Sequence, residues 1–356
     1  MLWPVYIPQK SGRSDTRREA IVAQQLPKNR LTQNTAKHPR LTAVLLIMLD
    51  ALVPVFFGMA LGYLGGWTRD VDNKHVAELN ALVMDFAVPA SMFVTVVQAS
   101  RRTLLDELPL AANLSISMLI LYWATYVMAR RAFGADPGEA SIQALTTSLP
   151  NYASAGLPLI SALLGAEHVV AVAVAIACGS IVVSPITLVI LDSTSQAQGK
   201  RSIAASLVSA ATKPIVLSPI LAVAFVLTGI GLSDPLTRSF SLMGQVAGGA
   251  GLFLTGLILS AQKLGLGANA GIQTLLSNVA HPLLAAGLAW LFAVSPLTAR
   301  EAIVLSALPV GFFGVLFGLR FNVSSEVVGT TLIASTVLSV ATLAAAIYFT
   351  AGMGQP

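Results

Sequence analysis

The segment 148–159, Ser-Leu-Pro-Asn-Tyr-Ala-Ser-Ala-Gly-Leu-Pro-Leu, decides how this chain folds. It lies inside an apolar stretch long enough to cross a bilayer, yet two prolines and a glycine prevent one continuous helix. Backbone groups left unpaired by such a break would cost several kcal/mol each in lipid, so the break must line protein or water. Because asparagine, tyrosine and serine side chains surround it, the segment predicts a site that holds a solute.

A second interruption occurs at 307–318, Ala-Leu-Pro-Val-Gly-Phe-Phe-Gly-Val-Leu-Phe-Gly. Its glycines allow another backbone or a ligand to come close, and opposed helix N-termini offer N–H donors to a carboxylate. Two such breaks that meet at the midplane would form an anion site without any lysine. The competing interpretation is that the glycines only permit tight helix packing. The presence of two breaks at equivalent places in the chain favours the site.

The composition is that of a polytopic membrane protein. The 356 residues are 55% hydrophobic and only 10% charged, whereas soluble proteins contain roughly a quarter charged residues. The formal net charge of +5 arises in the first forty positions, which hold eight of the 21 Lys and Arg residues. From residue 41 onward, 13 basic and 14 acidic residues nearly cancel. The charge pattern therefore does not indicate a nucleic-acid-binding surface.

Residues 1–40 are expected to be a basic, disordered extension and are left out of the fold prediction. Met48 opens a span of conventional form and is as good a start for the natural protein as Met1. The single cysteine, Cys178, lies in an apolar run and has no partner for an intrachain disulfide.

The fold prediction is an all-α protein with ten transmembrane helices. Each apolar segment approaches or exceeds the length of about 20 residues that a ~30 Å hydrocarbon core requires. The segments are 41–66, 78–99, 108–129, 140–164, 168–191, 203–230, 240–260, 271–294, 301–319 and 325–350. Short loops join them and carry most of the charges, so no second soluble domain is expected.

The two halves of the chain resemble each other at a nearly constant offset. The pairs are Pro54 with Pro214, Met92-Phe93 with Leu252-Phe253, Pro150 with Pro309, Glu167 with Glu326, and Ser180 with Ser339. We therefore predict a first five-helix repeat at 41–193 and a second at 200–350. Because five is odd, the second repeat must be inverted in the membrane, as in many secondary transporters.

The Lys and Arg residues of the loops predict that both ends of the ten-helix unit face outward. Eight such residues then lie in cytoplasmic loops and four in outer loops. The basic tail opposes this orientation, unless it stays in the cytoplasm or is not part of the natural protein.

Few ionisable residues lie within the predicted spans, and each is a candidate for function because charge is costly in lipid. Asp85 lies four residues before Pro89, near carbonyls that the proline leaves unbonded, and could bind a coupling proton. Its alternative role is an interface carboxylate. His281 could relay protons or serve only in packing. Lys213 could attract an anion or extend its amine to the membrane surface.

Several segments carry a family resemblance. Asn151 to Leu159 resembles the fourth-span motif of the auxin efflux carrier family, and Ala334 to Ser339 resembles its last-span Ser-Thr motif. Pro54 to Gly66 and Val88 to Ala90 resemble its first two spans. The likeness covers roughly 48–350, and 309–318 looks most similar to the bacterial malonate-transporter branch.

This resemblance implies a scaffold of spans 1, 2, 6 and 7 and a mobile transport domain of spans 3–5 and 8–10, with broken helices crossing in spans 4 and 9. It also implies carboxylate substrates. Plant members place a second asparagine in the ninth-span break, where this chain has Val310 and Gly311. Auxin-like selectivity is therefore not implied.

We predict a secondary active transporter of small organic anions, located in a bacterial-type inner membrane. Malonate-like mono- or dicarboxylates are the first choice of substrate. The substrate-binding residues are predicted at the two breaks: Asn151, Tyr152, Ser154, Gly156, Pro158, Pro309, Gly311, Phe312 and Gly314. We expect membrane lipid and a second copy of the chain, packed through the scaffold spans, as partners. We expect no nucleic acid, metal or resident cofactor.

The sequence gives less support to two other functions. An intramembrane hydrolase would need a positioned base, yet Ser154 lacks a Gly-x-Ser-x-Gly context and His281 lacks a motif partner. A passive anion channel would not need the two paired breaks.

Concentrative anion uptake against an inside-negative potential is opposed by ~2.3 kcal/mol per charge per 100 mV and needs a co-transported cation. A nearly solitary carboxylate suits a proton, with Asp85 or His281 as the titrating group. Backbone carbonyls at the breaks could instead hold sodium.

Overall fold

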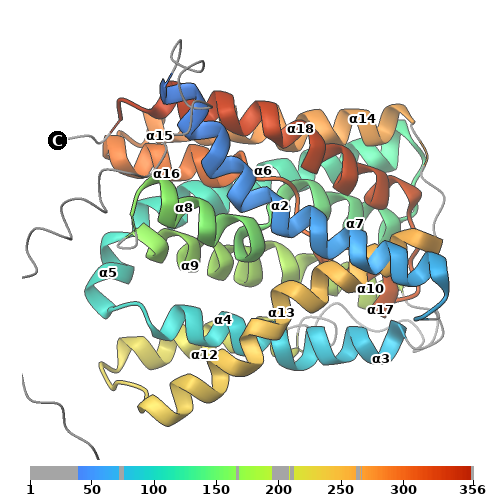
Figure 1. Ribbon diagram of the computed structural model, residues 1–356, viewed down its shortest axis with the longest axis horizontal. Helices are drawn as coiled ribbons and strands as arrows, with labels where there is room; N and C mark the ends of the chain where they lie inside the picture. The colour runs from blue at the N-terminus through green and yellow to red at the C-terminus, as the bar shows by residue number, and fades with distance from the viewer. Residues whose placement is uncertain are drawn as a thin grey trace, which may run out of the picture. The chain divides into compact units, whose positions relative to one another are not determined.

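The computed structural model describes residues 39–71, 76–165, 168–194, 208, 212–261, 265 and 267–353, and all regular structure among them is helical (Figure 1). The predicted extension at 1–40, apart from its last two residues, and the loop residues Lys74, Glu167, Lys200, Arg201 and Lys263 lie outside this part of the chain. Short π-helical turns, labelled η, interrupt or precede several of the α-helices. The elements are α2 (Pro39–Thr68), α3 (Val76–Ala81), η2 (Leu82–Ala87), α4 (Val88–Val97), α5 (Arg101–Asp106), α6 (Leu108–Ala132), α7 (Pro137–Ser148), η3 (Tyr152–Gly156), α8 (Leu157–Leu163), α9 (Val169–Cys178), η5 (Gly179–Val183), α10 (Ser184–Thr194), α12 (Pro214–Leu227), α13 (Asp234–Ala261), α14 (Ala268–Leu275), η7 (Leu276–Ala280), α15 (His281–Leu291), α16 (Pro296–Ser306), α17 (Phe313–Arg320) and α18 (Glu326–Thr350).

Six helices in the described part of the chain are long and apolar enough to cross a membrane. They correspond to the predicted spans 2, 3, 5, 7, 8 and 10, and are Val76–Val97, Leu108–Ala132, Val169–Thr194, Asp234–Ala261, Ala268–Leu291 and Glu326–Thr350. Three shorter apolar helices, Val53–Thr68, Ser154–Leu163 and Pro214–Leu227, fall in predicted spans 1, 4 and 6. The prediction of an all-α, polytopic membrane protein is confirmed.

Several predicted boundaries are wrong because charged residues join helix ends. The segment 234–238, predicted as loop, forms the first turns of α13. Arg101 and Arg102 begin α5, and Arg300 and Glu301 lie within α16. A helix end can carry charge at a membrane surface, whereas hydropathy alone marks only the apolar centre of a span.

The described residues contain four π-helical turns, and each ends directly before an Xaa-Pro pair. The proline ring would clash with the carbonyl four residues back, and a wider turn relieves that clash. The residue before each proline therefore donates its N–H to the carbonyl five residues back. These bonds are Val88 to Val83, Leu157 to Tyr152, Ser184 to Gly179 and His281 to Leu276.

The helices pack as two groups. In the first, which we call the α4 group, α4 and η2 pack against α12 and α13, and α3 continues the same span. In the second, the α7 group, α6 packs on α7, α15 on α16, α14 on α18, and α17 on α7. Helix α9 and η5 also pack on α6 and belong to the α7 group. Fewer contacts join the groups, mainly α4 with α9, α12 with η5 and α3 with α17. The buried core runs through both groups.

Helix α2 lies against α13 at two glycines. A Cβ atom on Gly62 would overlap the carbonyl oxygen of Phe253, and one on Gly256 would overlap that of Met59. Glycine is therefore required for the two backbones to approach this closely.

Candidate functional site

The first helix break follows α7. Asp136 caps the start of α7 by accepting a hydrogen bond from the N–H of Glu139 at 2.9 Å. Leu149 precedes Pro150 and adopts extended backbone angles, φ −114° and ψ 97°, so α7 ends at Ser148. Asn151 then caps the next turn, since its Oδ1 accepts a hydrogen bond from the N–H of Ser154 at 3.2 Å.

The second break follows α16. Ser295 caps that helix by accepting a hydrogen bond from the N–H of Thr298 at 3.1 Å. Residues 307–312 contain Pro309 and do not continue the helix, and α17 begins at Phe313. Helix interruptions are therefore present at both predicted prolines.

The two breaks meet and are bonded to each other. They form an isolated antiparallel bridge between Pro150 and Val310. The N–H of Asn151 donates to the Pro309 carbonyl at 2.8 Å, and the N–H of Gly311 donates to the Leu149 carbonyl, also at 2.8 Å. Each break thus satisfies backbone groups of the other, which lipid could not do.

Glycines at the second break permit this close approach. A Cβ atom on Gly311 would lie 3.0 Å from the Leu149 carbonyl oxygen, and one on Gly314 would overlap the Thr146 hydroxyl. Gly156 packs against Leu308, where a Cβ atom would lie 3.2 Å from the side chain. These glycines position the crossing.

A buried polar relay supports the second break from behind. The N–H of Val310 donates to Ser335 Oγ at 3.1 Å, and Ser335 Oγ donates to Asn278 Oδ1 at 2.6 Å. Asn278 Nδ2 in turn donates a hydrogen bond to the Ser335 carbonyl at 2.9 Å. Ser277 Oγ also donates to Asn278 Oδ1, at 2.9 Å. This relay fixes the break to α18 and η7.

A small cavity of about 40 Å³ lies beside the crossing, between the two helix groups. That volume holds one or a few water molecules and is too small for a dicarboxylate. It is lined by both breaks, by α4 and η5, and by Ala247 and Gly248 of α13. Its polar side chains are those of Ser91, Tyr152 and Ser180, and no charged residue lines it.

A second cavity of about 450 Å³ lies on the other side of Gly248. It is lined by α2, α13 and Ser154 of η3, again without a charged residue. Gly248 lines both cavities, and a Cβ atom added there would lie 3.5 Å from the Ser154 hydroxyl oxygen. The volume is within the range of small-molecule sites.

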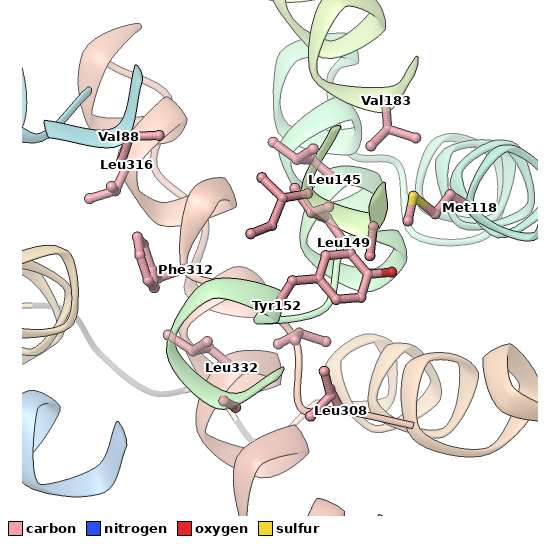
Figure 2. Close-up of a cluster of buried hydrophobic side chains, with 14 of the residues drawn as sticks. Val88, Met118, Leu145, Leu149, Tyr152, Val183, Leu308, Phe312, Leu316 and Leu332 are labelled. Carbon is pink, nitrogen blue, oxygen red and sulfur yellow. The ribbon is translucent and has the colours of Figure 1, made fainter. Parts of the chain in front are cut away.

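The predicted site residues divide into two sets. Tyr152 and Phe312 line the small cavity and Ser154 lines the larger one. The hydroxyls of Tyr152 and Ser154 are buried and have no partner among the described residues. Figure 2 shows the Tyr152 hydroxyl directed toward Met118, on the side away from Phe312. The second set supports the backbone: Asn151, Gly156, Pro309, Gly311 and Gly314 hold the crossing, and Pro158 starts α8.

The two coupling-ion candidates lie away from the small cavity. Asp85 forms an ion pair with Arg320, at 2.5 Å between Oδ1 and Nη1. His281 is fully buried, with its Nε2 3.3 Å from Ser117 Oγ, and its Nδ1 has no partner among the described residues. Whether either side chain binds a coupling ion stays a prediction.

Glu107, Glu301 and His168 form an acidic cluster where α6 and α9 begin. The carboxylate of Glu301 is 2% exposed and pairs with the His168 ring, at 2.9 Å between Oε1 and Nδ1. Burial raises the pKa of Glu107, which directly precedes α6, and the positive charge of His168 partly opposes that rise. Among the described residues, no three His, Cys, Asp or Glu side chains gather as a metal site would require.

Sequence reasoning missed Ser91, Ser180, Asn278 and Arg320. Asn278 carries a signal that could have been used, because it lies in the turn before the His281-Pro282 pair, where backbone groups need new partners. Nothing local marks Arg320 as the partner of Asp85, since 235 residues separate them.

Comparison with known proteins identifies the family. A family model described as "Membrane transport protein" matches residues 47–347. The chain belongs to this family. The match confirms the resemblance to auxin efflux carriers, and this membrane transport protein is an integral, multi-pass membrane protein.

Two curated relatives are transporters by name. The chain is 28% identical over 302 residues to the "Uncharacterized transporter YfdV" of Escherichia coli (strain K12). The alignment covers 83% of this chain and 95% of the relative. The chain is 26% identical over 313 residues to the "Putative malonate transporter" of Rhizobium meliloti (strain 1021), covering 84% of this chain and 95% of the relative. The family and these names indicate a transporter rather than an enzyme.

Proposed function

We propose that this protein is a secondary active transporter of small organic anions, with malonate-like mono- or dicarboxylates as first choice. The observation that carries the proposal is the pair of hydrogen-bonded helix breaks beside a small cavity. No charged side chain lines that cavity, so backbone N–H groups and hydroxyls would have to bind the anion. Helix N-termini and hydroxyls are suited to hold a carboxylate there. The name of the Rhizobium relative supports the choice of substrate.

The proposed mechanism is elevator-type alternating access within a ten-helix, inverted-repeat unit. The α4 group, together with α2, corresponds to the proposed scaffold of spans 1, 2, 6 and 7. The α7 group corresponds to the proposed transport domain. The small cavity lies between them, so movement of one group past the other would widen it enough for a dicarboxylate. We extend the proposal to a bacterial-type inner membrane and to a dimer formed through the scaffold.

Neither alternative function gains support from the site. The base required by a hydrolase, His281, pairs with Ser117 rather than with Ser154. A channel would require a continuous path, whereas the space beside the crossing is divided into two separate cavities, the smaller of about 40 Å³.

The test is uptake of labelled carboxylates, malonate first, into proteoliposomes. Uptake is expected to accelerate under an imposed inward proton gradient and to respond little to a sodium gradient, since one carboxylate suits a proton better than a sodium ion. Acceleration by sodium alone would refute proton coupling. Absence of uptake for the whole panel under both gradients would refute the transport proposal.

Replacing Asn151 with alanine is expected to weaken malonate binding about tenfold. The side-chain oxygen of Asn151 caps η3, which leaves its amide group to donate hydrogen bonds to a carboxylate. One lost hydrogen bond to a charged group, about 1.5 kcal/mol, corresponds to that factor. Calorimetric titration of the purified protein measures the change.

Asn151→Ser is the matched control, because serine keeps a capping oxygen but lacks the amide. Both variants should bind malonate weakly, while only Asn151→Ala should lose about 1 kcal/mol of stability from the cap. Unchanged affinity in both variants would remove Asn151 from the site.

A further inference from the structure

Two side chains of the α3–η2 span hold α17. Asn80 donates a hydrogen bond from Nδ2 to the Leu316 carbonyl at 3.1 Å, and Asp85 pairs with Arg320. Asn80 and Asp85 are five residues apart, which would place them on different faces of a regular α-helix. The π turn Leu82–Ala87 has more residues per turn and thereby changes the direction of Asp85.

The ion pair borders a recess that also contains Lys213. We call it the basic recess; its lining includes Met84, Asp85, Leu188, Lys213, Phe317 and Arg320. Lys213 lies directly before α12, at a helix N-terminus whose unpaired N–H groups add positive potential. Among the described residues, no carboxylate lies within ion-pair distance of Lys213, so two cations face one anion.

The basic recess is nearly filled by the side chains that line it, including those of the ion pair. Its volume is about 10 Å³, room for about one water molecule. The side chains of Arg320 and Asp85 are nevertheless 30% and 26% exposed, so a solute can reach them. A carboxylate could enter only if Asp85 moved away from Arg320.

We propose that the basic recess binds a small carboxylate through Lys213 and Arg320, and that the bound anion displaces Asp85. A free carboxylate offers the same acceptor geometry to the guanidinium as Asp85 does, and Lys213 favours an additional negative charge. Displacement removes the Asp85–Arg320 ion pair, the only one that joins the α4 and α7 groups among the described residues. The anion thus loosens the hold of α3–η2 on α17 before it is transported, a role that rests on the proposed function.

The proposal predicts opposite effects for the two charges of the basic recess. Asp85→Asn removes the competing carboxylate and should tighten malonate binding about fivefold, whereas Lys213→Gln should weaken it about fivefold, each corresponding to ~1 kcal/mol. Binding is measured by calorimetric titration of malonate into protein in neutral detergent. Arg131→Gln, which removes an exposed charge at the end of α6, is the control and should leave the affinity unchanged.

Lys213→Gln keeps the proposal testable even if Asp85→Asn fails to fold, because Lys213 is no part of the ion pair. Equal affinities in Lys213→Gln and Arg131→Gln would overturn the proposal, as would weaker binding in folded Asp85→Asn. A lipid phosphate could occupy the same charges, so the titration is repeated with phosphatidylglycerol. A Lys213-dependent response to that lipid, without one to malonate, would also overturn it.

The outcome is separable from that of the transport test. If uptake occurs but the affinity for malonate is the same in Lys213→Gln as in the unaltered protein, the basic recess has no role and the proposed function stands. If malonate binds with the predicted charge dependence but no uptake occurs, the transport proposal fails and the binding site stands.

Discussion

Gly256→Ala is expected to lower the stability of the folded protein by about 3 kcal/mol, the upper end of the usual cost of overpacking. The added methyl group would overlap the carbonyl oxygen of Met59 and would lie 2.8 Å from the backbone nitrogen of Tyr63. Backbone atoms cannot rotate away as a side chain can, so α2 and α13 must separate. The midpoint of thermal unfolding in detergent, read by tryptophan fluorescence, measures the effect.

Gly287→Ala in α15 is the matched control, because no atom lies within 4 Å of a Cβ atom built there. It should leave the unfolding midpoint unchanged or raise it slightly, since alanine favours helix over glycine by about 1 kcal/mol. Gly62→Ala should behave like Gly256→Ala, because it meets the Phe253 carbonyl from the other helix. Equal midpoints for Gly256→Ala and Gly287→Ala would contradict the close approach of α2 and α13.

Ser335→Ala is expected to cost about 2 kcal/mol of stability and to reduce carboxylate uptake. The substitution leaves the N–H of Val310 buried without a partner, which costs 1–3 kcal/mol. It also removes the bond that ties the second break to Asn278. If the second break is less firmly held, its backbone hydrogen bonds to the first break should weaken. Uptake in proteoliposomes and the midpoint of thermal unfolding are therefore both measured.

Ser339→Ala provides the comparison one turn further along α18. Ser339 is as deeply buried as Ser335, but its hydroxyl donates only to the Thr336 carbonyl of its own helix, at 2.7 Å. Loss of such a local bond changes little. If Ser339→Ala were as damaging as Ser335→Ala, the relay to Val310 would have no special role.

Much of the architecture could be predicted from local sequence. Apolar length marks the spans, because a helix must hide its backbone from lipid over about 20 residues. Proline marks the breaks at Pro150 and Pro309, because it lacks an N–H donor and clashes with the preceding turn. The same property explains the π turns before Pro89 and Pro282, although their presence was not predicted.

The partners of the candidate residues could not be predicted in this way. Asp85 is marked as unusual by its place in an apolar span, but only folding brings it to Arg320. Asn151 is marked by its position beside Pro150, but its capping of η3 depends on the backbone path through the break. Contacts across more than two hundred residues leave no local trace in one sequence.

The sequence by itself determined a multi-pass, all-helical membrane protein with two helix breaks and polar residues around the first. Those features depend on periodicity, apolar length and proline, which act over a few turns of chain. Only the tertiary structure decided that the breaks bond to each other, that Ser335 and Asn278 secure the second one, and that Gly62 and Gly256 bring α2 onto α13. The physical reason is that a backbone group released by proline takes whichever partner the packing of distant helices places within reach.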